Sequence, residues 1–334
     1  MKVAVVVPCF NSARYIERTL DALQQLDSGG HELEFVLVDD GSIDDTAERI
    51  SRRGVTVIRQ PNAGPAAARN TGWRRAAGEV VCFTDADCVP PPGWVVGLLA
   101  GLDAADVGAV AGGYAAANDD QPLARLIQAE IAYRHRRMPA FVRAGGTYNL
   151  AVRRTVLEQV GGFDESFPTA SAEDNDLSYR IRQAGYRIAF RPGCRVAHHH
   201  PERIGTYLRT QYIHGFWRSR LYRKHPTFVS GDDYTRPRDM LDVVLAMGIS
   251  AAALPAAVGG PWAGWMAGGT AGALLLLEGW AAAGVAREAR EFGLWPLGLA
   301  AFTLRAFARM AGWVLGFLTP GLRSGRGNRG RMRR

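Results

Sequence analysis

The 334-residue sequence predicts an α/β domain built on a mainly parallel sheet, followed by a helical region that associates with a membrane. Two observations predict this architecture. Over the first 90 residues, short β-branched runs alternate with helical patterns, which is typical of a parallel sheet with helices on both faces. From about residue 240 the composition changes to long apolar stretches rich in alanine and glycine, of the kind that cross a bilayer or lie on it.

Each element of the first part has its own signal. Runs of β-branched residues predict strands, and apolar residues three and four positions apart predict helices. Ser12 is placed to cap the first helix, whose apolar face carries Ile16, Leu20 and Leu23. The expected elements are strands at 2–7, 33–38, 55–59 and 80–84 and helices at 13–26, 44–52 and 64–77.

Polar residues follow three of these strands, at 8–11, 39–42 and 85–87. Because ligands bind outside the carboxyl ends of parallel strands, the three clusters are expected to meet at one rim of the sheet. The last cluster holds Asp85 and Asp87, and two such carboxylates offer hard oxygen ligands to a divalent cation. A cation there can hold a diphosphate and neutralise its charge as it leaves. Taken alone, the aspartates of 39–42 and 85–87 are explained equally well as turn and capping residues.

A second acidic pair opens a later helix. Glu173 and Asp174 precede the apolar positions Leu177 and Ile181, and Gly185 fits the end of that helix. The pair therefore lies near the positive end of a helix dipole, where a carboxylate stays ionised, as a general base requires. A solvated helix start is the alternative, and taken alone it is the better explanation.

In this order, the motifs and their neighbours resemble the family 2 glycosyltransferases, which have the GT-A fold. The resemblance covers residues 1 to about 200. It implies a Rossmann-like, mixed and mainly parallel sheet, and an enzyme that transfers a hexosyl or related group from a nucleotide sugar. The matching segments are 7–11, 38–42, 62–70, 85–87, 161–165 and 173–177.

The resemblance also implies roles for single residues. Asp174 takes the position of the catalytic base, with Glu173 beside it, and His198 that of a late histidine that completes the metal shell. The implied mechanism is a single inverting displacement, in which Asp174 removes the acceptor proton and Mg²⁺ or Mn²⁺ stabilises the departing diphosphate. For the triplet 198–200, a solvated loop or an adventitious metal site is the alternative. The implied donor-binding positions are Pro8, Asn11, Asp39, Asp40, Arg69, Asp85 and Asn149, and the implied metal ligands are Asp87, Asp85 and His198.

The chain departs from the family patterns in two places. Processive members carry a Gln-x-x-Arg-Trp motif after the base, and the stretch from Gln211 to Trp217 does not match it. This favours single additions over polymerisation. The family's short Gly-x-Asn step is stretched to Gly146-Thr147-Tyr148-Asn149, which points to an unusual donor or acceptor preference.

The sequence from 240 to 320 predicts membrane-associated helices after a linker at 226–239. Two apolar segments, 242–258 and 262–285, are expected to form a helical hairpin, each about as long as the ~30 Å hydrocarbon layer requires. A third, 294–318, carries Arg305 and Arg309 one turn apart and is expected to be an interfacial helix or a third span. The alternative is a buried helical domain of a soluble protein.

Charge and composition complete the expectation. The formal net charge is +8, and the tail at 321–334 contains six arginines and no acid. Such a tail favours anionic lipid on the cytoplasmic face, which places the catalytic domain, residues 1–225, on that face of the cell membrane. The basic segments 134–137 and 218–224 are explained either by anionic headgroups or by ordinary solvation.

The predicted partners are therefore a nucleotide-sugar donor, a lipid-linked or cell-envelope glycan acceptor and the membrane. No segment resembles a base-reading module, so no nucleic-acid partner is expected. The four cysteines lack metal-ligand spacing and are expected to be reduced. The alternative function is a non-catalytic scaffold of the same fold that binds a nucleotide sugar, and its expected mark, a damaged acidic step or a missing base, is not present in this sequence.

Overall fold

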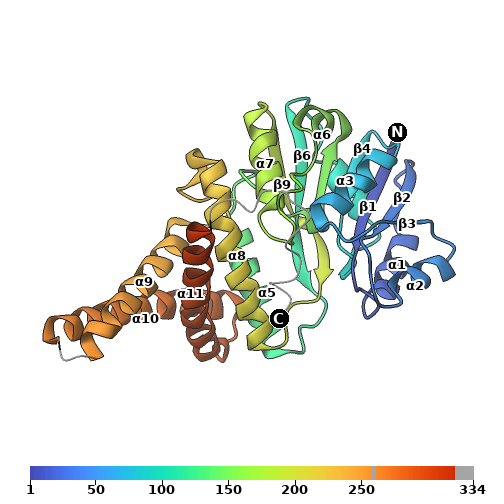
Figure 1. Ribbon diagram of the computed structural model, residues 1–334. Coiled ribbons are helices and arrows are strands. Elements are labelled where there is room, and N and C mark those ends of the chain that lie inside the picture. The colour runs from blue at the N-terminus through green and yellow to red at the C-terminus, as the bar shows by residue number, and fades with distance from the viewer. Residues whose placement is uncertain (258–259, 320–334) are drawn as a thin grey trace.

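The computed structural model describes residues 1–257 and 260–319 (Figure 1). The basic tail expected at 321–334 and part of the turn expected between the two hairpin helices lie outside these residues. The strands are β1 (Lys2–Cys9), β2 (Glu32–Asp39), β3 (Val57–Arg59), β4 (Val80–Phe83), β5 (Cys88–Val89), β6 (Val107–Ala116), β7 (Phe141–Val142), β8 (Leu150–Arg153) and β9 (Arg187–His198). The helices of the first 230 residues are α1 (Ile16–Gln24), α2 (Thr46–Arg52), α3 (Pro65–Arg75), α4 (Trp94–Leu99), α5 (Pro122–His135), α6 (Arg154–Val160), α7 (Glu173–Gln183) and α8 (Ile204–Lys224), with the 3-10 helices η1 (Thr147–Asn149) and η2 (Pro226–Phe228). The last three helices are α9 (Pro237–Ala257), α10 (Pro261–Ala289) and α11 (Leu294–Leu318).

One mixed sheet forms the centre of the first 200 residues. Its strand order is β3-β2-β1-β4-β8-β6-β9-β5, and β7 pairs with β9 beside this path. The strands β3, β2, β1 and β4 are mutually parallel, and β6 and β9 form a second parallel pair. Between them β8 runs antiparallel to both β4 and β6. The expected mixed, mainly parallel α/β sheet is therefore confirmed.

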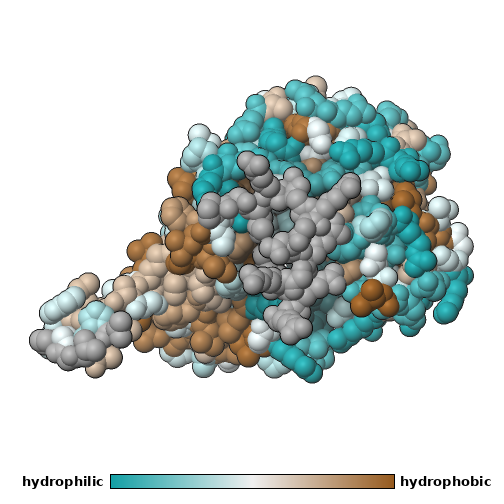
Figure 2. All heavy atoms as spheres, in the orientation of Figure 1, coloured by the Kyte–Doolittle hydropathy of each residue, from teal (hydrophilic) through white to brown (hydrophobic). Residues whose placement is uncertain are grey.

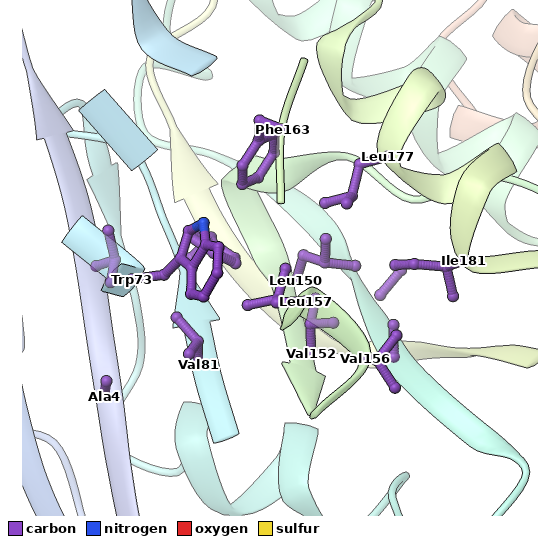
Figure 3. Packing of buried hydrophobic residues seen from close by; sticks show 14 of the residues in the cluster. Ala4, Trp73, Val81, Leu150, Val152, Val156, Leu157, Phe163, Leu177 and Ile181 are labelled. Carbon is purple, nitrogen blue, oxygen red and sulfur yellow. The ribbon is translucent and has the colours of Figure 1, made fainter. Parts of the chain in front are cut away.

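Both faces of this sheet are covered, so its central strands have no polar side. In β1, Ala4 and Val6 pack into the core beneath α3, α6 and α7, whereas Val5 packs into the core beneath α1 and α4. This explains why the strand reads as a continuous apolar run and not as an alternating one. Figure 3 shows the first core, where Trp73 of α3 and Leu157 of α6 lie with Leu150 and other side chains of the sheet.

The predicted elements are all present, and one detail is wrong. Ser12 does not cap the first helix through its side chain, because its hydroxyl donates to the carbonyl of Phe10 instead. The carbonyl of Ser12 accepts from Tyr15 and Ile16, and the helix begins only at Ile16. The end of α7 agrees with the prediction, since Gly185 follows it with a φ of +92°.

The three C-terminal helices are each long and apolar enough to cross a membrane. In Figure 1, α9 and α10 run side by side and project from the body as a hairpin, while α11 lies along α8 of the catalytic domain. Figure 2 shows apolar residues gathered over these helices and hydrophilic residues over most of the sheet domain. These helices are consistent with the expected membrane association, and the number of spans stays a prediction.

Glycines bring α11 against α8 at backbone distance. A Cβ on Gly312 would lie 2.0 Å from the carbonyl oxygen of Tyr212, and one on Gly215 would lie 2.2 Å from that of Arg309. Small residues at such a crossing let two helices approach closely, as in membrane proteins. The third helix is thereby fixed to the catalytic domain.

The two arginines of α11 explain the rest of this junction. Arg305 is buried and donates to both carboxylate oxygens of Glu130 on α5, at 2.7 and 2.8 Å. Arg134 forms ion pairs with Glu130 at 2.8 Å and with Asp239 of α9 at 2.6 Å. Arg309 lies 3.6 Å from Asp239. We call these five residues the junction network. The arginines share a face, as the sequence predicts, and that face is turned toward the catalytic domain.

Candidate active site

The acidic step follows β4, the strand next to β1 in the middle of the sheet. Asp85 accepts a hydrogen bond from Nη2 of Arg69 at 2.7 Å. Arg69 comes from α3 and is almost wholly buried. Its Nη1 donates to Oε1 of Glu173, the first residue of α7, at 2.9 Å. Burial disfavours the charge on Arg69, but the two carboxylates more than offset this, so its pKa is raised. One guanidinium therefore joins the acidic step to the predicted base motif.

Strand pairing brings the late histidine to the same place. β5 runs antiparallel to β9, and Cys88 lies opposite His198 in that ladder. Asp87, just before Cys88, has its Oδ2 atom 3.5 Å from Nε2 of His198. The ligand atoms of Asp87, Cys88 and His198 all lie within 4.8 Å of one another.

The chemistry of this group fits a hard divalent cation. The Nδ1 atom of His198 is buried and makes no hydrogen bond within the described part of the chain, and burial raises the pKa of Asp87. A cation would satisfy the carboxylate and the imidazole together. Burial also raises the pKa of Cys88 well above its usual range, so its thiol stays protonated and is a poor ligand. Asp87 and His198 are the two residues best placed to hold Mg²⁺ or Mn²⁺.

The two residues of the base motif have different surroundings. Both residues line the main cavity, but Glu173 is buried and bonded to Arg69, whereas Asp174 is half-buried. Burial raises the pKa of Glu173 to about 7, aided by the charge of Asp174 and opposed by Arg69. Burial also raises the pKa of Asp174, although the backbone N–H of Asn175 donates to it at 2.7 Å. Asp174 is therefore the more exposed of the two carboxylates at this part of the cavity wall.

The polar residues after β1 and β2 form a second part of the rim. Asn11 has a φ of +49° and accepts a hydrogen bond from the backbone of Ile43 at 2.9 Å, while Ser42 accepts one from the backbone of Asn11. In the parallel β1–β2 pair, Pro8 lies opposite Val38 and Cys9 lies opposite Asp39. The rim predicted from the strand ends is thus assembled.

Asp40 holds this rim together from inside. Its carboxylate accepts hydrogen bonds from the Gln60 side chain at 2.7 Å and from the backbone of Ala63 and Gly64 at 2.8 Å. The residue is 3% exposed. Its observed contacts order the loop before α3, and direct contact with a donor stays a prediction.

Asn149 has a similar internal role. Its amide donates to the carbonyls of Gly113 and Cys194 at 2.9 and 2.8 Å and accepts from the indole of Trp94 at 2.8 Å. The side chain is fully buried and does not line the main cavity. These bonds fix β6, β9 and α4 relative to one another, so the predicted donor contact has no support in the observed geometry.

One cavity of about 490 Å³ connects the predicted chemistry to the C-terminal helices. Its polar end is lined by Asp85, Asp174 and His198. Its other end is lined by apolar side chains of α9 and by the indole of α11, namely Met240, Val243, Val244, Met247 and Trp313.

Two arginines and a histidine of the C-terminal half also line the cavity. Arg218 of α8 and Arg309 of α11 line it, together with His214 one turn before Arg218. Burial lowers the pKa of His214 to about 3, so this imidazole is neutral. Arg218 donates a hydrogen bond to Asp232 at 3.1 Å, and Arg309 donates one to the side-chain oxygen of Gln211 at 2.8 Å.

The fold and the acidic rim of its sheet define the GT-A class of transferase. The sequence model described as "Glycosyl transferase family 2" matches residues 4–161. Glycosyltransferase AglE of Haloferax volcanii is 30% identical over 230 residues, which are 63% of this chain and 70% of that protein. The chain belongs to glycosyltransferase family 2.

Other relatives and a solved structure agree with this assignment. The pre-mycofactocin glycosyltransferase of Mycobacterium tuberculosis is 30% identical over 67% of this chain, and the probable glycosyltransferase YdaM of Bacillus subtilis is 30% identical over 64%. The chain spans about half the length of these two proteins, 48% and 55%. The mannosyltransferase PcManGT of Pyrobaculum calidifontis, solved with GDP-Man and Mn²⁺, superposes with a TM-score of 0.62 at 24% identity. That match covers 95% of this chain and 86% of PcManGT, so the shared fold includes the C-terminal helices.

Sequence reasoning missed most of the cavity wall. Tyr114 of β6 belongs to no motif, and Tyr148 of η1 lies in the stretched step at 146–149, yet their rings stack with centroids 3.4 Å apart in this wall. The available signals were the basic segments 134–137 and 218–224, which supply Arg134 and Arg218, and the pair Arg305 and Arg309, whose charges inside an apolar helix needed partners. The sequence alone did not indicate that the partners belong to the catalytic domain.

Proposed function

We propose that this protein adds single sugars, with inversion, from a nucleotide-sugar donor to a lipid-linked acceptor at a membrane surface. The observation that carries the proposal is the single cavity that has the acidic step and Asp174 at one end and the apolar side chains of α9 and α11 at the other. A water-soluble acceptor would have no use for the apolar end. A lipid-linked acceptor would fill both ends at once.

The donor would bind at the strand ends. Asn11 and Asp39, at the ends of β1 and β2, would contact the nucleoside, and Asp87 and His198 would hold the cation beside the diphosphate. When bound, the cation would neutralise the negative charge that develops on the departing diphosphate. Arg69, locked between Asp85 and Glu173, would hold both carboxylates in place while the donor binds.

Asp174 would act as the general base. It faces the cavity, and the charge on Arg218 lies near enough to lower its pKa in part. An acceptor hydroxyl placed between Asp174 and the anomeric carbon would lose its proton to the carboxylate as the new bond forms. Attack from the face opposite the diphosphate inverts the anomeric centre, and no covalent sugar–enzyme intermediate is needed.

Two features support single additions to an anionic lipid carrier. Gln211, which starts the stretch that lacks the processive motif, is nearly buried and holds Arg309. Arg309 and Arg218 line the same cavity as Asp174, and their guanidinium groups would bind a lipid phosphate or diphosphate.

The test is a donor and acceptor screen with the full chain in detergent. GDP-mannose is the first donor, followed by UDP- and dTDP-sugars, each with Mn²⁺, Mg²⁺ or EDTA, and the acceptor is a lipid extract. We expect one nucleotide class to stabilise the protein with metal and to label the organic phase, and Asp174→Asn to abolish labelling while donor binding remains. Asp103→Asn, an exposed acid far from the site, is the matched control. Label found only in water-soluble glycan would contradict the lipid acceptor, and full activity of Asp174→Asn would contradict the base.

A further inference from the structure

A second cavity, of about 570 Å³, lies outside the catalytic site between the end of α5 and the last third of α10. Arg136 and Arg137 line it from the α5 side, and Arg287 and Arg290 line it from the α10 side. We call it the α5–α10 pocket. The nucleotide-sugar chemistry proposed above uses none of its residues.

The α5–α10 pocket has excess positive charge. Glu288 is the one acid that lines it, and this carboxylate accepts from Arg136 at 2.8 Å and from Arg137 at 2.9 Å. Arg287 and Arg290 are exposed and have no acidic partner within the described part of the chain. Four arginines against one glutamate leave a formal charge of +3, which fits an anionic ligand.

Part of the pocket is held in place in advance. The guanidinium of Arg137 lies 3.8 Å from the ring centroid of Tyr133, and Glu288 fixes it from the other side. The hydroxyl of Tyr133 packs against Gly284 of α10, where an added Cβ would lie 3.1 Å from it. Glycine at this position keeps the pocket open between the two helices.

One face of α10 leads from apolar surface into this pocket. Leu276, Trp280, Gly284 and Arg287 are spaced by four, four and three residues, so they share one side of the helix. Leu276 is 77% exposed and Trp280 is 70% exposed. The side chains therefore change from aliphatic to aromatic to cationic over ~16 Å of helix.

This order of side chains matches the depth profile of a bilayer surface. Aromatic residues gather at the level of the headgroups, with aliphatic residues deeper and arginines further out. A second tryptophan marks the same level, because the indole of Trp295 on α11 donates to the carbonyl of Gly279 at 3.0 Å and its ring stays partly exposed.

We propose that the α5–α10 pocket binds the headgroup of an anionic phospholipid, with the phosphate on Arg287 and Arg290 and an acyl chain along Trp280 and Leu276. A free phosphate would use the arginines but not the exposed apolar face that adjoins them. The bound lipid would set the depth of α10 in the membrane. It would place the end of α10 and the catalytic domain on the same side of the bilayer.

The experiment measures lipid binding by the full chain in a neutral detergent. Tail-labelled phosphatidylglycerol is titrated and followed by fluorescence anisotropy, and phosphatidylcholine with the same chains is the neutral reference. The test variant is Arg287→Gln/Arg290→Gln. The control variant is Arg52→Gln/Arg75→Gln, which removes two exposed and unpaired arginines from α2 and α3. Gly284→Leu fills the pocket without changing its charge, and thermal melting checks the fold of each variant.

We expect phosphatidylglycerol to bind more tightly than phosphatidylcholine, and the double variant to weaken it about 25-fold, at about fivefold for each arginine near an anionic headgroup. The control should bind like the wild type, and inorganic phosphate should not displace the lipid. Equal binding of the two lipids by the wild type would overturn the proposal. So would a double variant that keeps the preference, or an oligonucleotide that displaces the lipid at equal charge. None of these results depends on sugar transfer.

Discussion

Arg69 and Glu173 lie 104 positions apart in the chain, and a hydrogen bond of 2.9 Å joins them inside the protein. The bond links α3, which follows the nucleotide-binding rim, to the first turn of α7, which carries Asp174. The other guanidinium nitrogen of Arg69 holds Asp85. The proposed donor site and the proposed base thus share one buried cation, and small changes at this cation should affect both.

The first prediction concerns the pH dependence of Glu173→Gln. Because burial raises the pKa of Glu173 to about 7, the wild-type side chain is protonated below that pH, and glutamine imitates it. We expect the variant to match the wild type at pH 6. As the pH rises through about 7, the wild-type Glu173 becomes charged, and its negative charge makes Asp174 a stronger base. The kcat/KM of the wild type should therefore rise in this range, and that of the variant should not. Profiles of kcat/KM from pH 5 to 9 measure this.

Asp174→Asn is the reference for that experiment. It should lose about 10²–10⁴-fold at every pH, which is the range for a positioned general base. A variant Glu173→Gln as inactive as Asp174→Asn at pH 6 would show that Glu173 itself is the base.

The second prediction is that Arg69→Met removes both donor binding and the fold of the site. Glu173 and Asp85 would lose their shared partner, and a buried unpaired carboxylate costs several kcal/mol or takes up a proton. We expect transfer to fall at least about 10²-fold and the melting temperature to drop. Arg69→Lys keeps the charge but not the two-sided geometry, so it should recover stability more than activity. Equal activity of the lysine variant and the wild type would mean that the bridge is not needed.

The third prediction concerns the cation. Asp87→Asn and His198→Gln should each weaken the Mn²⁺-dependent stabilisation of the protein by a nucleoside diphosphate. The reason is that the ligand atoms of these two side chains lie 3.5 Å apart and could hold one cation together. Nucleotide binding in EDTA should change little. His200→Gln is the control, since His200 is buried and bonded to Gln128 at 3.0 Å. If His200→Gln lost the metal effect and His198→Gln kept it, the assignment within the histidine triplet would be reversed.

The fold and the rim could be predicted from the sequence because their signals are local. A β-branched run, a following turn and an acidic step are each read within ten residues, and parallel pairing then brings their ends together. Arg305 is 175 positions from its partner Glu130, and no spacing rule encodes such a contact. The wall around Tyr114 likewise joins Tyr148, 34 positions away, to His198, 84 positions away. The internal hydrogen bonds of Asp40 and Asn149 could not be predicted for the same reason, since they form only when the strands are assembled.

The fourth prediction concerns the junction network. Arg305→Met leaves Glu130 with Arg134 as its cation. Glu130→Gln leaves the buried Arg305 with the more distant carboxylate of Glu278, 3.9 Å away, so Glu130→Gln should cost about 3–5 kcal/mol. The pKa of Glu130 is lowered to about 2, chiefly because the charges of Arg305 and Arg134 outweigh its burial. Its contribution to stability is therefore complete above about pH 4.5 and is lost as the pH falls toward 2. Melting of the wild type from pH 7 to pH 3 should show this loss.

The double variant Glu130→Gln/Arg305→Met is the control for that measurement. It removes the pair together, so it should be more stable than Glu130→Gln alone. A double variant whose loss equals the sum of the two single losses would mean that the residues act independently.

The fifth prediction tests the apolar end of the main cavity, which supports the lipid acceptor. Met247 lines that end from α9, two turns beyond Met240, and is far from the acidic step in the chain. Met247→Asp places a charge where an isoprenoid or acyl chain would lie, which should raise the KM for a lipid acceptor and leave metal-dependent donor hydrolysis unchanged. Met247→Leu keeps the volume and the apolar character and should behave like the wild type. Initial rates against lipid concentration, with donor hydrolysis measured in the same samples, separate the two effects. An aspartate variant that loses donor hydrolysis and acceptor transfer equally would place the effect on the fold of the cavity, whereas an unchanged KM would show that the acceptor chain does not contact α9.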